Sequence, residues 1–276
     1  MRRRSIVQRA ARICPLPQSA LRVMHLTRDA TSSWDAIVDA VESDPAIAAE
    51  VLRLGRSPAY HPRYGATDLR TICRMLGQRA LHDLTAAMAL LASFRSDHEL
   101  GLRAHETGAL AGQLAVRRSS RLELDVPSRA FLAGLLCEVG ALVCLAVDGE
   151  RYAAMRAEAR TEPERRAAET RSYGDTSFAI GAELLWETGL APAICKAVHG
   201  IDNDPLSTLV RLARRASGAL IDPEARGVGT WPTVLSRLVA DEGLRLDGDA
   251  LRAIAEEAFS STAKRLRGLR RVRRQA

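Results

Sequence analysis

The side chains that could carry chemistry are few and scattered along the chain. The sequence holds six histidines and five cysteines, and no two cysteines form a C-x-x-C pair. Serine nucleophile elbows, phosphate-cradling glycine loops and paired-cysteine zinc signatures do not occur as spaced motifs. The sequence therefore supports none of these common enzyme classes. The odd number of unpaired cysteines favours reduced thiols in a cytoplasm.

One carboxylate lies in an unusual place. Residues 130–147 are apolar except for Glu138. A stretch of this length raises the question of a membrane span. A carboxylate at its centre is unfavourable in lipid, and a buried helix of a large helical domain explains the same pattern. We therefore expect a core helix here and no transmembrane segment.

The net charge of +7 is concentrated at the two ends of the chain. Five arginines lie in the first twelve residues, seven basic residues lie in the last thirteen, and neither segment contains an acid. The residues between them are therefore net acidic, which argues against nucleic-acid binding by the folded surface. The C-terminal basic residues are either solvated or contact nucleic acid, anionic lipid or an acidic protein: Lys264, Arg265, Arg267, Arg270, Arg271, Arg273 and Arg274.

The elements that must position these residues are predicted to be helices throughout. Aromatic residues make up only 4% of the chain, whereas Ala, Leu and Arg are abundant, and this composition favours helices over strands. Asp44 before Pro45, and Asp68 before an apolar periodic stretch, predict helix starts. A central helix is expected from Ser128 through Val143, with apolar residues on both sides.

Later segments also show helical spacing. A helix is predicted from Phe178, with a break at Gly189 and a restart at Pro192. The last helix of the main domain is predicted over residues 206–216, and Gly, Pro and Asp then punctuate residues 222–231. We expect an all-α fold with a basic N-terminal arm over residues 1–12, a main domain over 13–218 and a C-terminal helical extension with a basic tail over 219–276.

Several segments resemble successive signatures of HDOD domains, which are degenerate relatives of the HD phosphohydrolases. The order and spacing of these segments carry the match, which covers roughly residues 13–216. They are Leu16-Pro17, Asp44-Pro-Ala-Ile-Ala-Ala-Glu-Val-Leu-Arg-Leu54, Ser57-Pro-Ala-Tyr60, Leu69-Arg-Thr-Ile-Cys-Arg-Met-Leu-Gly77, Phe131-Leu-Ala-Gly-Leu-Leu-Cys-Glu-Val-Gly140 and Gly181-Ala-Glu-Leu-Leu-Trp-Glu-Thr-Gly-Leu190. The resemblance implies a multi-helical fold with an N-terminal helical subdomain and an HD-like helical half, used in bacterial signalling.

The resemblance also indicates where a metal site has been lost. HD enzymes hold metal ions with imidazoles and carboxylates, and the metal activates a water for attack on phosphorus. His105 matches the first ligand histidine, but Cys137-Glu138 stands where the family has His-Asp, and Arg214 stands near the final aspartate. Ser177 replaces a ligand histidine of some relatives, and His199 lies near a histidine pair of related domains. We call these six residues the vestigial site.

A guanidinium cannot donate a lone pair to a metal, so Arg214 argues against catalysis of the family type. If the old ligand positions still converge, Glu138 and Arg214 form a buried salt bridge, and a distance well beyond about 4 Å would exclude it. The alternative is that Glu138 points to solvent. Zinc ligation by His105, Cys137 and Glu138 also remains open but lacks a convincing fourth ligand. His105 and His199 have plain structural explanations as well.

The expected function is that of a non-catalytic cytoplasmic regulatory module without a cofactor. It would bind a protein partner, with a nucleotide as the alternative ligand, through the vestigial site and the groove between its subdomains. One alternative is a divergent metal-dependent phosphohydrolase or phosphodiesterase. Another is nucleic-acid binding through the basic tails.

Overall fold

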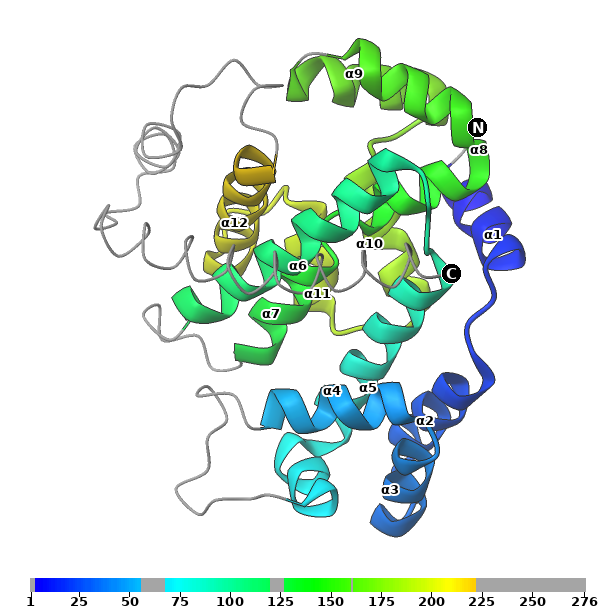
Figure 1. Cartoon of the computed structure of the whole chain (residues 1–276), viewed down its shortest axis with the longest axis vertical. Coiled ribbons are helices and arrows are strands. Elements are labelled where there is room, and N and C mark those ends of the chain that lie inside the picture. Colours follow the sequence, from blue (N-terminus) through cyan, green and yellow to red (C-terminus); the bar gives the residue numbers. More distant parts are fainter. Residues whose placement is uncertain (1–2, 56–67, 120–126, 160, 222–276) are drawn as a thin grey trace, which may run out of the picture.

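A computed structural model describes residues 3–55, 68–119, 127–159 and 161–221, and these residues form helices and no strand (Figure 1). The segment 57–60 of the family resemblance and residues 222–276, with the basic tail, lie outside this part of the chain. The helices are α1 (Arg3–Ile13), α2 (Gln18–Arg28), α3 (Trp34–Glu42), α4 (Pro45–Gly55), α5 (Leu69–Ser93), α6 (Glu99–Ser119), α7 (Pro127–Leu135), α8 (Val139–Glu158), α9 (Glu162–Tyr173), α10 (Ser177–Glu187), α11 (Pro192–His199) and α12 (Pro205–Ile221).

The helices divide into two halves joined by α5. Helices α2, α3 and α4 pack on one another and on α5 in the lower half of Figure 1. The upper half contains α6 packed on α7 and α12, and α10 packed on α8 and α11. This is the all-helical arrangement of an N-terminal subdomain and an HD-like half that the sequence predicts.

Two predicted helix starts are confirmed by their caps. Asp44 accepts backbone N–H groups from Ala46 at 3.0 Å and Ile47 at 3.2 Å, and Pro45 opens α4. Asp68 accepts the N–H of Thr71 at 2.9 Å at the start of α5. Each carboxylate satisfies amides that the first turn of a helix leaves without partners.

The predicted central helix is broken at the Cys137-Glu138 doublet. Helix α7 ends at Leu135, residues 136–138 form a turn, and α8 begins at Val139. Glu138 has φ −110° and ψ 11°, outside the helical region. The prediction of one continuous helix was therefore wrong. Because both segments are apolar on all sides, their periodicity gives no sign of the turn.

Two glycines allow α8 and α10 to cross with their backbones almost touching. A Cβ on Gly140 would lie 1.7 Å from the carbonyl oxygen of Ser177, and a Cβ on Gly181 would lie 2.9 Å from the backbone nitrogen of Gly140. Only glycine fits this approach. The crossing places the turn at Glu138 beside the start of α10.

The N-terminal segment is part of the packed body. Helix α1 is formed by residues of the predicted basic arm. It packs on α8 and α10, with Ile6, Val7 and Ala10 fully buried. Arg3 forms ion pairs with Asp175 at 3.1 Å and Glu183 at 3.2 Å. The arginines of this segment therefore lie on a docked helix.

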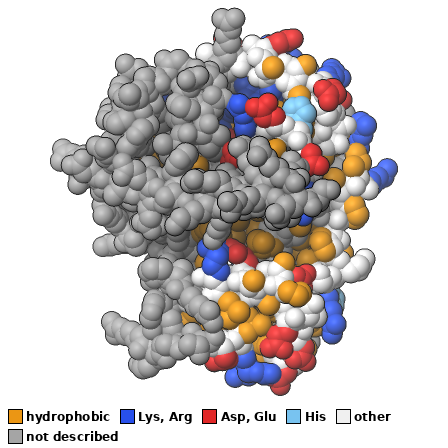
Figure 2. Space-filling view, viewed as in Figure 1, with side chains coloured by type: hydrophobic (Ala, Val, Ile, Leu, Met, Phe, Trp, Pro, Cys, Tyr) orange, Lys and Arg blue, Asp and Glu red, His pale blue; other side chains and the backbone are white. Residues whose placement is uncertain are grey.

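Among the described residues, α7 and α8 with the turn between them (Ser128–Glu158) are together long and apolar enough to cross a membrane, but 89% of their most apolar window is buried inside the protein. Burial of this kind is typical of a core helix in a soluble protein. In Figure 2, charged side chains are frequent around the upper rim of the described surface, and hydrophobic side chains gather lower on the same face.

Candidate functional site

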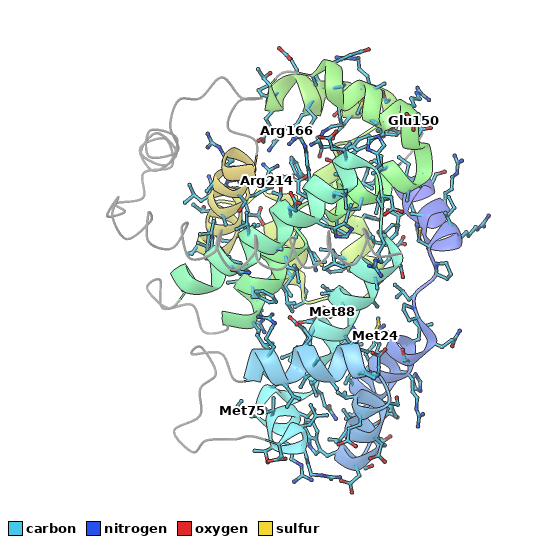
Figure 3. All side chains as sticks on the ribbon, in the orientation of Figure 1. Met24, Met75, Met88, Glu150, Arg166 and Arg214 are labelled. Carbon is cyan, nitrogen blue, oxygen red and sulfur yellow. The ribbon has the colours of Figure 1, made fainter. Side chains whose placement is uncertain are left out.

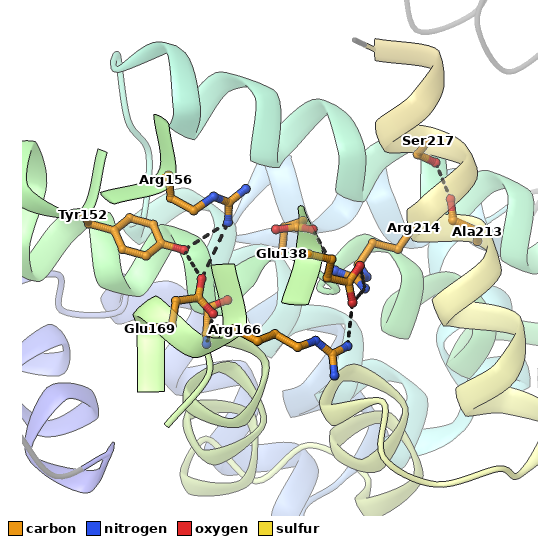
Figure 4. A network of polar contacts seen from close by, with 10 residues as sticks. Glu138, Tyr152, Arg156, Arg166, Glu169, Ala213, Arg214 and Ser217 are labelled. Carbon is orange, nitrogen blue, oxygen red and sulfur yellow. Dashed lines mark hydrogen bonds and ion pairs between the residues drawn. The ribbon is translucent and has the colours of Figure 1, made fainter. Parts of the chain in front are cut away.

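The turn between α7 and α8 brings Glu138 to Arg214 on α12. Nη1 of Arg214 lies 3.5 Å from Oε1 of Glu138, so the ion pair expected from the sequence is present (Figure 4). Both residues are only 8% exposed. The alternative in which Glu138 points to solvent is therefore excluded. A carboxylate and a guanidinium buried this deeply depend on each other, because neither is hydrated.

Arg214 has a second carboxylate partner that the sequence analysis did not single out. Its Nη2 donates to both oxygens of Glu162 at 3.2 Å, and Nη2 of Arg166 donates to Oε1 of Glu162 at 2.6 Å. Burial works to raise the pKa of Glu162, but Arg214, Arg165 and Arg166 together lower it to about 2. Glu162 is therefore a carboxylate held by cations from two helices, α9 and α12.

The ring of Phe178 is surrounded by the same cations. The guanidinium carbons lie 4.0 Å from the ring centroid for Arg214, 5.1 Å for Arg166 and 5.3 Å for Arg165. Contacts of this length are cation–π interactions, which help to hold guanidinium groups out of water. Figure 3 shows Arg166 and Arg214 near each other in the upper half of the molecule.

A second polar network lies beside the first (Figure 4). Glu169 is fully buried, accepts the hydroxyl of Tyr152 at 3.0 Å and lies 3.8 Å from Arg156. Its other oxygen accepts the backbone N–H of Ser177 at 2.8 Å. Glu169 thus ties α8, α9 and the first residue of α10 together.

A pocket opens next to these networks. Its walls include Cys137, His199 and Arg214 of the vestigial site, together with Arg166, Arg211 and Phe178. Ser177 precedes Phe178 and is buried, and its hydroxyl has no hydrogen-bond partner. The structure therefore brings most of the vestigial site to one place. We call this hollow the arginine pocket.

His105 is not among the residues that line the arginine pocket. Its Nε2 lies 3.2 Å from the carbonyl oxygen of Phe94, a distance that fits a donated hydrogen bond. Burial lowers the pKa of His105, which favours the neutral imidazole. These contacts fit the structural explanation of a hydrogen-bonded core imidazole.

The residues present do not fit a metal ion of the HD type. The carboxylate of Glu138 is engaged by Arg214, and burial raises the pKa of the Cys137 thiol, so the thiol stays protonated. Within the described ranges, no group of three His, Cys, Asp or Glu side chains could hold a metal. His199, whose pKa is lowered by burial, lies beside three arginines in the pocket wall. A guanidinium at this position repels a cation.

Sequence reasoning missed five residues of this site: Glu162, Arg165, Arg166, Phe178 and Arg211. The run from Thr161 to Arg166 does carry a helix-start signature, because Thr161 and Glu164 form a capping box. That signature locates the start of α9 but not what it packs against. Only the tertiary arrangement shows that Glu162, in the first turn of α9, contacts Arg214.

The model of the HDOD domain family matches residues 13–203 of the chain. This chain belongs to the HDOD domain family. The match spans the helices that form both halves, including the turn at Glu138 and the start of α10. It ends just before α12, which carries Arg214.

Solved structures share the fold of this HDOD protein at low sequence identity. A provisionally assigned phosphohydrolase from Shewanella amazonensis SB2B is 19% identical with a TM-score of 0.64, and the alignment covers 93% of each chain. An HDOD domain protein with unknown function from Geobacter sulfurreducens is 18% identical with a TM-score of 0.56, over 94% of this chain and 96% of the other. A provisionally assigned signal transduction protein from Marinobacter aquaeolei VT8 is 24% identical with a TM-score of 0.55, over 91% of this chain and 57% of that one.

A comparison with curated proteins finds no match. The structural neighbours show the fold alone at these identities.

Proposed function

We propose that this HDOD protein is a regulatory module that acts by binding and does not catalyse phosphoryl hydrolysis. The observation that carries the proposal is the buried ion pair between Glu138 and Arg214, 3.5 Å apart at positions where the family resemblance implies metal ligands. A metal would have to displace a guanidinium that is bonded to two carboxylates. Without the metal, water lacks the activation that the HD reaction needs.

The binding partner is proposed to be a protein, and a nucleotide is the alternative ligand. The neighbour from Marinobacter, named for signal transduction, makes such a role plausible for a chain of the same fold. Cytoplasmic location remains part of the proposal, and it accords with five free cysteines, of which four are buried.

A divergent metal-dependent phosphohydrolase is the second candidate, because a neighbour from Shewanella is named for that activity. The two are separated by measuring metal content and turnover of bis(p-nitrophenyl) phosphate on the full chain, purified without chelators. The proposal predicts no stoichiometric transition metal and no turnover above buffer, with or without added Mn²⁺. Stoichiometric metal together with turnover that His105→Ala abolishes would overturn it.

A variant in which the metal ligands of the family are restored serves as a positive control for metal binding. The triple substitution Cys137→His, Glu138→Asp and Arg214→Asp returns the His-Asp doublet and the final aspartate while keeping His105. We expect this variant to bind Mn²⁺ or Zn²⁺ more tightly than the natural chain. Equal metal affinity of the two chains would show that these three residues do not control the site.

A further inference from the structure

The cluster around Glu138 holds four guanidinium groups and three carboxylates. Arg156 pairs with Glu169, Arg214 pairs with Glu138, and Arg166 shares the Glu162 carboxylate with Arg214. Arg165 is the surplus cation: it is 8% exposed, and its Nε and Nη2 atoms have no hydrogen-bond partner. A guanidinium cannot neutralise itself by losing a proton, so burial of this kind calls for another anion.

The adjoining arginine pocket has the charge that an anion requires. Its described walls carry Arg166, Arg211 and Arg214 with His199, and no carboxylate is among the residues lining it. The space that water can enter in this hollow is only about 10 Å³, which is room for about one molecule. Arg211 is oriented by the carbonyl oxygen of Asp202, to which its Nη1 donates at 2.7 Å. A small oxyanion is favoured here on charge, and it gains room only by displacing a side chain, whereas a whole nucleoside would have to remain outside.

Glu162 does not line the pocket, but its carboxylate already binds two of the arginines that do. Its carboxylate accepts hydrogen bonds from Nη2 of Arg166 at 2.6 Å and from Nη2 of Arg214 at 3.2 Å. Its side chain is 33% exposed, whereas that of Arg214 is 9% exposed, so the carboxylate lies on the accessible side of the pair. Planar guanidinium groups converging on one oxyanion are the usual arrangement for phosphate recognition.

We propose that the arginine pocket binds the phosphate group of a small phosphomonoester or free phosphate, which takes the place of the Glu162 carboxylate on Arg166 and Arg214 and balances the surplus charge of Arg165. The proposal rests on the proposed function, because it treats the pocket as a binding site without a metal. A phosphate dianion carries one charge more than the carboxylate it displaces. That extra charge corresponds to the one unmatched guanidinium.

Exchange of Glu162 for phosphate has a structural consequence that suits a regulator. Glu162 lies in the first turn of α9 and is bonded to α12 through Arg214. When phosphate occupies the two arginines, this link between α9 and α12 is released. Ligand binding is thereby coupled to the attachment of α9.

The proposal is tested by isothermal titration calorimetry of the full chain with inorganic phosphate and, in parallel, with AMP, at constant ionic strength. Removing the competing carboxylate with Glu162→Gln is expected to tighten phosphate binding about tenfold or more, since a charge-assisted contact contributes roughly 1.5–3 kcal/mol and 1.4 kcal/mol is tenfold. Arg166→Gln is expected to weaken it by a similar factor. Equal affinities for both ligands indicate that the phosphate alone is bound, and tighter AMP binding indicates contacts outside the pocket.

Two matched controls come from exposed residues near the same cluster. Glu158→Gln and Arg171→Gln make the same charge changes on exposed positions of α8 and α9 and should leave affinity unchanged. Thermal melting of each variant checks folding, and because Arg166 is 43% exposed on its side chain, its substitution should be tolerated. Absence of binding to both ligands by the natural chain and by Glu162→Gln would overturn the proposal, as would equal losses in Arg166→Gln and Arg171→Gln. Neither outcome bears on the metal and turnover assay, so the two proposals can fail separately.

Discussion

The guanidinium of Arg214 makes two ion pairs with carboxylates that differ in burial. Glu138 is 8% exposed, whereas the Glu162 side chain is 33% exposed and can be hydrated if its partner is lost. Arg214→Met therefore removes the guanidinium that lies 3.5 Å from the buried carboxylate of Glu138. We expect this substitution to reduce the free energy of unfolding by about 3–5 kcal/mol, measured by urea denaturation at pH 7.

The double variant Glu138→Gln with Arg214→Met distinguishes a lost ion pair from lost packing. Because it removes both charges, it should recover part of the stability that Arg214→Met loses. Arg171→Met, at an exposed position of α9, should change the free energy of unfolding by less than about 0.5 kcal/mol. A double variant no more stable than Arg214→Met would mean that Arg214 stabilises the protein by packing on Phe178.

Glu162 gives the stability of the protein a dependence on acid pH. Its pKa is lowered from 4.5 to about 2, so its ionised form stabilises the fold above pH 4.5, and this contribution is lost as the pH falls from 4.5 toward 2. After allowance for partial exposure of the side chain, the contribution is on the order of 1–2 kcal/mol. Urea unfolding at pH 7 and pH 3 should show a smaller loss for Glu162→Gln than for the natural chain. Glu158→Gln should retain the full loss, and an equal loss in all three proteins would contradict the assignment.

At the scale of the helices, the crossing of α8 and α10 makes a sharp prediction at Gly140. Helix propensity alone would make Gly140→Ala stabilising by about 1 kcal/mol. The structure predicts the opposite sign, because the added Cβ would lie 1.7 Å from the backbone oxygen of Ser177. We expect a loss of about 3 kcal/mol or more in urea unfolding, since two backbones must move apart.

Ala154→Gly serves as the comparison, because Ala154 is exposed on the same helix and should lose only about 1 kcal/mol. If Gly140→Ala proved neutral or stabilising, the close crossing of α8 and α10 would be wrong.

The same elements show how far the sequence could predict this structure. The helix starts at Asp44 and Asp68 could be predicted because capping is a local interaction between a side chain and the next turn. The break at residues 136–138 could not be predicted in this way, because these three residues include no glycine or proline to mark it. The family resemblance located Glu138 and Arg214, but Glu162 and Arg166 join them only through the position of α9.

Across the whole molecule, the two halves are tied through α5. Asp83 is 2% exposed and accepts the backbone N–H of Ala191 at 3.0 Å, and Arg79 donates to the carbonyl oxygen of Gly189 at 3.0 Å. Both contacts reach the turn between α10 and α11, and α11 supplies His199 to the arginine pocket. Arg79 and Asp83 therefore connect α5 to the turn that precedes α11, the helix that supplies His199 to the pocket wall.

The charge of the whole chain leads to a last prediction about nucleic acid. The seven basic residues between Lys264 and Arg274 account for the entire net charge of +7. If DNA binding occurs through this tail, its dependence on salt should follow the number of phosphates contacted, with a logarithmic slope of up to about −6 for seven contacts. Deleting residues 264–276 should then abolish binding to a duplex of random sequence, measured by fluorescence anisotropy between about 50 and 200 mM salt. Replacing the seven residues with Gln should have the same effect, because the interaction depends on charge and not on tail length. Unchanged salt-sensitive affinity in either variant would exclude the tail as the nucleic-acid contact and would place binding on residues 1–263, which together carry no net charge.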